Sequence, residues 1–208
     1  MSEIFKFLLK INELKSIKRK GISFYGVGDP DSAVDHSFRM ALMVWVFGSK
    51  KDIKLERVIK MALIHDLAKI DVGDITPYEG LLPKGEKDKQ EFVGRWRRLS
   101  IDDKEKRHND KKEKEKKALK GLIKGLSKDL KLEIMDIWSD YHNQRTKEAK
   151  FVHQVDVLEN LLEALEKWRE NDTFPTLPWW EHAEEVIEDP DLLIFLKEIE
   201  KDETGKLD

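Results

Sequence analysis

Apolar residues recur every three or four positions along most of this chain, and that spacing restricts its fold more than any other feature. The clearest stretch runs from Thr146 to Trp168, where one apolar stripe continues for about four helical turns. The stripe consists of Phe151, Val155, Leu158, Leu162 and Leu165. No segment alternates apolar and polar residues as a half-exposed strand would. The sequence therefore predicts an all-α protein built as a single-domain helical bundle.

Capping residues and helix breakers place the other helices. Ser32 stands three residues before Asp35, a pattern that opens a helix predicted to continue to about Phe47. Gly73 ends a helix expected from about Leu55 to Ile70. Shorter helices are predicted over 4–14, 118–126, 130–141 and 191–201, and a loop is expected from Lys20 to Asp31.

The composition restricts the cellular setting and the class of partner. The chain has 208 residues, which suits one domain, and 39% of them are charged although the net charge is only −3. It contains no cysteine, which excludes disulfides and thiolate metal sites. The longest uncharged apolar run, Met40 to Phe47, is too short to cross a bilayer. These features predict a cytoplasmic protein that has no membrane partner.

Between about Lys84 and Lys117 the sequence becomes almost uniformly charged. A solvated helix or a surface insertion, centred on about Asp88 to Asp110, accounts for this composition. The alternative is a nucleic-acid contact along Lys104 to Lys120, but Asp and Glu interrupt the lysines throughout. We therefore expect no nucleic-acid partner.

Three of the predicted helices carry polar residues where core residues are expected. His65 and Asp66 have apolar neighbours on both sides, and His36 lies about one turn into its helix. Asp156 interrupts the last helix beside its buried stripe. A buried aspartate needs a cationic partner, which is a lysine, an arginine or a metal. Taken singly, each residue is better explained as a core residue satisfied by a local hydrogen bond or salt bridge. Together they raise the hypothesis of a site for Mn, Fe, Co, Ni or Zn.

The order His…His-Asp…Asp resembles the pattern of the HD superfamily of metal-dependent phosphohydrolases. Three segments, PDSAVDHSFRMALM, ALIHDLAKIDVGDITP and KEAKFVHQVDVLEN, are similar in order and spacing to motifs of the HD-domain 5′-deoxynucleotidases. The resemblance implies a helical HD domain over 1–208, with the charged insertion at about 88–110. It implies that His36, His65, Asp66 and Asp156 hold one divalent transition metal. Related proteins are commonly dimers, so a homodimer is expected, with the Trp179–Trp180 pair as a candidate contact.

The same resemblance assigns further site residues. Asp74 matches an active-site aspartate, with a role in orienting or deprotonating the attacking water. Lys69 stands where close relatives carry Glu, and Ile22 stands where they carry Trp. One helical turn separates Lys69 from His65 and Asp66, so the ammonium is predicted to contact a bound phosphate, although a surface lysine or a partner for Asp66 is the alternative.

Two arginines are further candidates for phosphate binding, because a planar guanidinium suits a phosphate dianion. Arg19 lies in the basic run before the predicted loop, and Arg39 lies one turn beyond His36. The predicted reaction is removal of the 5′-phosphate from (deoxy)nucleoside monophosphates. The alternatives are hydrolysis of a cyclic or polyphosphorylated nucleotide and a non-catalytic module that binds a nucleotide or a metal.

Overall fold

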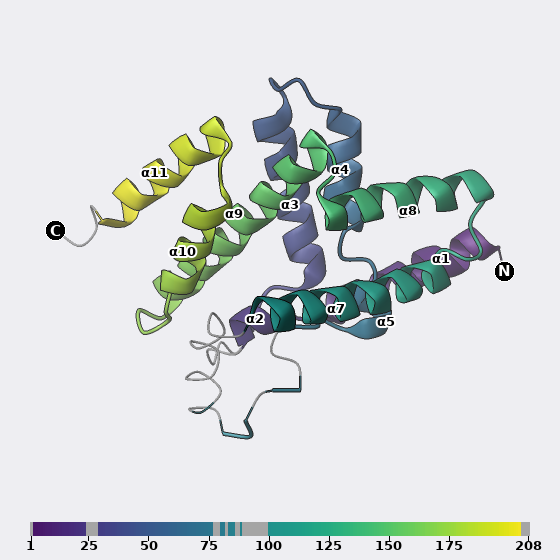
Figure 1. Ribbon diagram of the computed structural model, residues 1–208, viewed down its shortest axis with the longest axis horizontal. Coiled ribbons are helices and arrows are strands. Elements are labelled where there is room, and N and C mark those ends of the chain that lie inside the picture. The colour runs from purple at the N-terminus through teal and green to yellow at the C-terminus, as the bar shows by residue number, and fades with distance from the viewer. Residues whose placement is uncertain are drawn as a thin grey trace. The chain divides into compact units, whose positions relative to one another are not determined.

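The computed structural model describes residues 2–23, 29–76, 80–81, 83–85, 88 and 100–204. These residues form helices joined by turns, and within them there is no strand, only one isolated antiparallel bridge between Lys18 and Ser32. The predicted all-α class is confirmed (Figure 1). In chain order the elements are α1 (Glu3–Ile11), the 3-10 helix η1 (Asn12–Ser16), α2 (Lys20–Ser23), α3 (Ala33–Gly48), α4 (Leu55–Ile64), α5 (Lys69–Val72), α7 (Ile101–Leu122), α8 (Lys128–Asn143), α9 (Lys147–Glu170), α10 (Leu177–Val186) and α11 (Pro190–Thr204).

The chain divides into two compact units. The first contains Met1–Ser37 and Ile64–Trp138, and the second contains Phe38–Leu63 and Ser139–Asp208. Helices α3, α4 and α8 each contribute residues to both units. The expectation of one HD domain over the whole chain stays a prediction.

The core of the first unit forms around the buried face of α7, which packs on the short helix α5. Leu119 and Trp138 are almost fully buried there, and η1 contributes Leu14. The other buried members of this cluster are Ala33, Leu67, Ala68, Ile70, Ile123 and Leu126. Burial of this apolar surface holds α5, and the residues just before it, in place.

The core of the second unit forms along α9, against which α10 and α11 both pack. Its buried residues include Phe151, Val155 and Leu158 of the predicted stripe. Thr146 caps the helix by accepting a hydrogen bond from the amide of Ala149 at 3.1 Å. The sequence therefore located both the start and the buried face of α9.

Several boundaries differ from the sequence-based expectations. The helix expected from about Leu55 to Ile70 ends at Ile64, and a turn with i-to-i−3 backbone bonds precedes α5. Four residues of the loop expected from Lys20 form α2. The helix expected over 118–126 coincides with the end of the longer α7 only as far as Leu122, and a turn follows. Helix α10 was not expected, because Pro178 and two tryptophans conceal its helical spacing.

Candidate metal centre

His36 is held in the first turn of α3 by a reciprocal cap. The amide of Ser32 donates to Asp35 Oδ2 at 2.9 Å, and the amide of Asp35 donates to Ser32 Oγ at 3.3 Å. This arrangement is the capping box that the sequence predicted. The amide of His36 itself donates to the carbonyl of Ser32 at 3.2 Å, and its imidazole is buried. The cap therefore sets the position of the first candidate ligand.

His65 and Asp66 lie in the turn between α4 and α5. The amide of Lys69 donates to the carbonyl of Asp66 at 3.0 Å, which closes a tight turn around the pair. His65 Nε2 lies 3.2 Å from His36 Nε2, with 67° between the ring planes. Asp66 Oδ2 lies 3.4 Å from the same nitrogen of His65. Three ligand-type atoms from two segments of the first unit thus converge.

The spacing of the two imidazoles fits a shared metal ion. Two metal–nitrogen bonds of about 2.1 Å that meet at about 90–110° place their nitrogens roughly 3.0–3.4 Å apart. The observed separation of His36 Nε2 and His65 Nε2, 3.2 Å, lies inside that range. Without a cation, one nitrogen must donate a proton to the other. Imidazole and carboxylate donors together suit a divalent transition metal.

Lys69 links the pair to Asp74. Its Nζ lies 2.8 Å from Asp66 Oδ2 and 2.7 Å from Asp74 Oδ1. Asp74 Oδ2 also accepts a hydrogen bond from the amide of Lys20 at 2.7 Å. All three charged side chains are largely buried. Besides a phosphate contact, the sequence left two alternatives for Lys69. The structure shows one of them, an internal ion pair with Asp66, and excludes the other, an exposed surface lysine.

The charge states of this cluster follow from its contacts. Burial raises the pKa of Asp66, but the charges of His65 and Lys69 lower it by more, so it lies below its ordinary value. Burial lowers the pKa of Lys69, but the two carboxylates raise it by more, above its ordinary value. Burial likewise opposes ionisation of Asp74, yet Lys69 holds its pKa below the usual range. At neutral pH both carboxylates and the ammonium are therefore charged.

Asp156 is held by two donors within the second unit. Tyr141 Oη donates to Asp156 Oδ2 at 2.5 Å, and Asn160 Nδ2 donates to Asp156 Oδ1 at 2.9 Å. Tyr141 lies near the end of α8, and Asn160 lies one turn further along α9. The two bonds fix the carboxylate of this half-buried residue. Its role as a metal ligand stays a prediction of the sequence resemblance.

The two arginines have different surroundings. Arg39 Nε donates to Glu159 Oε1 at 2.9 Å, and its Nη1 donates to Glu166 Oε2 at 2.6 Å. These bonds join its guanidinium to two carboxylates of α9. The positive charge of Arg19 lowers the pKa of Lys69, which places Arg19 within electrostatic range of the site. Phosphate binding by either arginine stays a prediction.

Sequence reasoning missed three residues around these groups. Glu115 is buried on α7, and burial raises its pKa, while the charges of Asp66 and Asp74 act in the same direction. It lies within a run of charged residues, where nothing distinguishes it from its neighbours. Tyr141 and Asn160 were missed as partners of Asp156, although Asn160 follows it at helical i+4 spacing.

The helical fold and this donor set define a protein class: an all-α protein whose paired histidines and aspartate suit a divalent metal. Comparison with known proteins agrees. The family described as "HD domain" matches residues 11–178. The 5′-deoxynucleotidase HDDC2 of Xenopus laevis is 34% identical over 163 residues, which cover 78% of this chain and 68% of that protein.

Two solved structures are also similar to this chain in sequence and fold. A protein from Pyrococcus horikoshii is 26% identical with a TM-score of 0.66, over 98% of this chain and 99% of its own. A predicted metal-dependent phosphohydrolase from Magnetospirillum magnetotacticum is 25% identical with a TM-score of 0.58, over 79% of this chain and 71% of its own. The chain belongs to the HD domain family.

Proposed function

We propose that this chain is a metal-dependent phosphohydrolase that removes the 5′-phosphate from (deoxy)nucleoside monophosphates. The observation that carries the proposal is the convergence of His36 Nε2 and His65 Nε2, 3.2 Å apart, beside the carboxylate of Asp66. The chain belongs to the HD domain family. Proteins similar to it are named 5′-deoxynucleotidases, which supports this substrate class.

His36, His65 and Asp66 would hold the metal, and the sequence resemblance adds Asp156 as the fourth ligand. A divalent ion of Mn, Co, Ni, Fe or Zn, when bound, supplies a Lewis acid that activates water near neutral pH and neutralises charge on the phosphoryl oxygens. Hydrolysis forms a bond from the water oxygen to phosphorus and breaks the bond from phosphorus to the 5′ oxygen, which leaves with a proton.

Asp74 and Lys69 are the residues of this chain proposed to act on the reacting groups. The carboxylate of Asp74 is fixed by Lys69 and by the amide of Lys20, so it is placed to orient the attacking water or to take its proton. The ammonium of Lys69 would stabilise negative charge on a phosphoryl oxygen while it stays anchored to the two carboxylates. Arg19 and Arg39 are the proposed contacts to the phosphate dianion.

One observation favours a second function. By the sequence resemblance, Lys69 stands where close relatives carry Glu, and its ammonium forms an ion pair with Asp66, a proposed metal ligand, at 2.8 Å. A cation at this point competes with a metal ion for the carboxylate. That competition supports a non-catalytic HD module that binds a nucleotide or a metal. The other alternative, hydrolysis of a cyclic or polyphosphorylated nucleotide, uses the same metal ligands.

Phosphate release from a panel of nucleotides, repeated with each metal, tests the proposal. Ribo- and deoxyribonucleoside 5′-monophosphates should be hydrolysed, and 3′-monophosphates, triphosphates and cyclic nucleotides should be poorer. Metal analysis should find about one ion per chain, and Asp66→Ala should abolish both metal binding and turnover. Better hydrolysis of triphosphates or cyclic nucleotides would overturn the substrate assignment, and metal binding without any turnover would favour the non-catalytic module.

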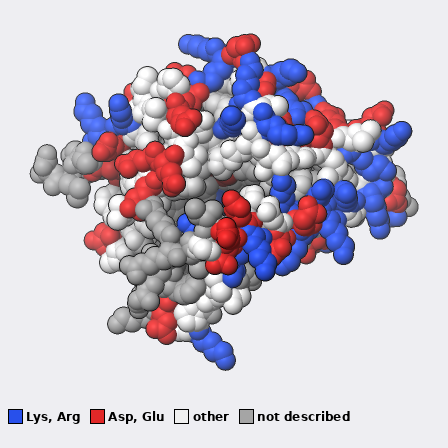
Figure 2. Space-filling model, viewed as in Figure 1, with Lys and Arg blue, Asp and Glu red and all other residues white. Residues whose placement is uncertain are grey.

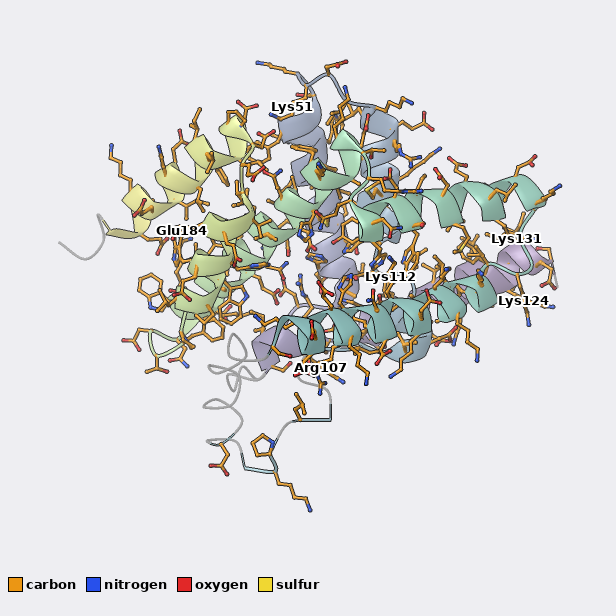
Figure 3. The ribbon with its side chains drawn as sticks, in the orientation of Figure 1. Lys51, Arg107, Lys112, Lys124, Lys131 and Glu184 are labelled. Atoms are coloured by element: carbon orange, nitrogen blue, oxygen red, sulfur yellow. The ribbon has the colours of Figure 1, made fainter. Side chains whose placement is uncertain are left out.

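A cytoplasmic location, a homodimeric state and the lack of nucleic-acid and membrane partners stay predictions. Among the described residues, no helix is both long enough and apolar enough to span a bilayer. Figure 2 shows Lys and Arg side chains intermixed with Asp and Glu on the face viewed, rather than one continuous basic surface. In Figure 3, Arg107 and Lys112 lie along α7, where acidic residues also alternate with the basic ones. This mixture supports the expectation that nucleic acid is not a partner.

A further inference from the structure

The phenol of Tyr141 is buried and makes a short hydrogen bond to the carboxylate of Asp156. Tyr141 is 9% exposed, and its Oη donates to Asp156 Oδ2 at 2.5 Å. A bond of this length is typical of a hydroxyl that donates to a charged carboxylate, and such bonds are about twice as strong as those between neutral groups. Tyr141 lies near the end of α8 and Asp156 lies on α9, so the bond joins two helices of the second unit.

The second donor to Asp156 is of a different kind. Asn160 Nδ2 donates to Asp156 Oδ1 at 2.9 Å, and the same amide group donates to the backbone carbonyl of Asp156 at 2.6 Å. Both bonds are local, because they stay within one turn of α9. Asn160 therefore restrains the carboxylate against its own helix, whereas Tyr141 restrains it from a different helix.

Two imidazoles hold the ring of Tyr141 in place. The ring of His153 on α9 lies at 67° to it, with 6.3 Å between centroids, and the ring of His142 lies at 86°, with 5.2 Å between centroids. Edge-to-face packing of this kind is a preferred arrangement of aromatic rings. The rotamer of Tyr141 is therefore set by packing before its hydroxyl reaches the carboxylate.

We propose that Tyr141 is a positioning residue of the metal centre, which holds the carboxylate of Asp156 in the orientation that binds a divalent transition metal. The inference rests on the proposed function, in which Asp156 is the fourth ligand. A ligand that is already held loses less freedom when the metal binds. Groups that hold metal ligands in this way typically change metal affinity by about 10- to 100-fold. Tyr141 touches neither the metal nor the substrate in this role, so it acts through Asp156 alone.

The alternative is a purely structural role for the hydroxyl, and the same two helices contain a bond that serves as the control. Thr146 Oγ1, at the start of α9, donates to Oδ2 of Asp140 on α8 at 2.8 Å. Asp140 is fully buried, pairs with Arg57 and is not a proposed metal ligand. Thr146→Val removes this bond and the cap of α9 together, so it should destabilise the fold at least as much as Tyr141→Phe.

Calorimetric titration of the full chain with Co²⁺ is the first test. Tyr141→Phe should bind Co²⁺ about 10- to 100-fold more weakly than the parent. Thr146→Val should bind it as tightly as the parent, although urea unfolds this variant more easily. Unchanged affinity in Tyr141→Phe, or equal losses in both variants, would overturn the proposal. A parent that binds no metal would overturn the proposed function and this inference with it.

The visible absorption of bound Co²⁺ provides a second reading, which reports the arrangement of the ligands rather than the stability of the fold. At saturating Co²⁺, the spectrum of Tyr141→Phe should differ from that of the parent, and the spectrum of Thr146→Val should not. Identical spectra for Tyr141→Phe and the parent would contradict a role in orienting Asp156. Neither measurement uses turnover, so a chain that gives both expected results but hydrolyses no nucleotide would sustain this inference while the proposed reaction fails.

Discussion

Lys69 is the residue at which, by the sequence resemblance, this chain departs most informatively from the HD-domain 5′-deoxynucleotidases. Its ammonium contacts Asp66 and Asp74 at 2.8 and 2.7 Å, inside the first unit. Breaking a buried ion pair from one side is costly, because the remaining charge loses its partner. Lys69 therefore stabilises the folded metal-free protein, while it competes with a metal ion for Asp66. Loss of the Lys69 ammonium should therefore lower the stability of the metal-free protein, but it should not weaken metal binding.

Lys69→Met should separate the two effects. In metal-free protein the free energy of unfolding should fall by about 3 kcal/mol, because two buried carboxylates lose their common cation. Metal binding should be as tight or tighter, because the competing ammonium is removed. If Lys69 also contacts the transferred phosphoryl group, the catalytic rate should fall by about a hundredfold. Urea unfolding in a chelator, calorimetric metal titration and steady-state kinetics measure these three quantities.

Lys60→Met is the matched control, since its exposed pair with Glu56 on α4 should contribute only about 0.5 kcal/mol. Unchanged stability of metal-free Lys69→Met would show that the ion pairs with Asp66 and Asp74 do not stabilise the fold. Lys69→Glu introduces the residue that the sequence resemblance implies at this position, and its activity can be compared with that of the parent. A Lys69→Glu variant more active than the parent would favour the non-catalytic module as the function of the natural chain.

At the scale of elements, the sequence located the helices whose signals are local. Ser32 and Asp35 indicated the start of α3, and Thr146 marks the start of α9, because caps act over three residues. The break between α4 and α5 was missed, since nothing in VIKMALIHDLAKI distinguishes a tight turn from a continuing helix. The tertiary packing of Leu67 and Ala68 in the core of the first unit decides it.

The cap of α3 also bears on the site, because His36 lies in the turn that it orders. Ser32→Ala should lower the free energy of unfolding by about 1 kcal/mol and weaken metal binding, as the first turn frays. Ser100→Ala is the control: Ser100 accepts a hydrogen bond from the amide of Asp103 at 3.0 Å and caps α7 in the same way. It should cost stability and leave metal affinity unchanged. If both variants changed metal affinity equally, the cap of α3 would have no specific role in positioning His36 for the metal. Thermal unfolding and metal titration give the two readings.

At the scale of the whole molecule, sequence prediction succeeded for the class of site and failed for its internal contacts. The motif order His36…His65-Asp66 was sufficient to expect a metal centre, and the structure brings these three residues together. The sequence left open whether Lys69 faces solvent, a phosphate or Asp66, since one helical turn allows all three. It did not reveal the contacts of Arg39 with Glu159 and Glu166, which lie over 100 residues away in the chain. Such long-range pairs carry no local signal.

The charged insertion at about 88–110 lies partly outside the described residues, and its last part, from Ile101, forms the start of α7. The helix is exposed or half-exposed over 102–114, and its fully buried residues follow, beginning with Glu115 and Leu119. The packed part of α7 therefore lies beyond the insertion. We therefore expect the part of α7 from Glu115 onward to contribute much more to the stability of the fold than residues 102–114.

Deletion of 88–110, closed by a short Gly-Ser linker, should leave metal binding intact, because no proposed ligand lies there and α7 keeps its contacts with α5. Leu119→Ala in the full chain is the contrasting variant, and it should cost about 3 kcal/mol, because it leaves a cavity in the core of the first unit. Metal content and urea unfolding measure both effects. A deletion variant that loses its metal or fails to fold would show that the exposed start of α7 is an integral part of the domain. Retained metal binding alongside unchanged turnover would instead show that the reaction needs none of the 23 deleted positions.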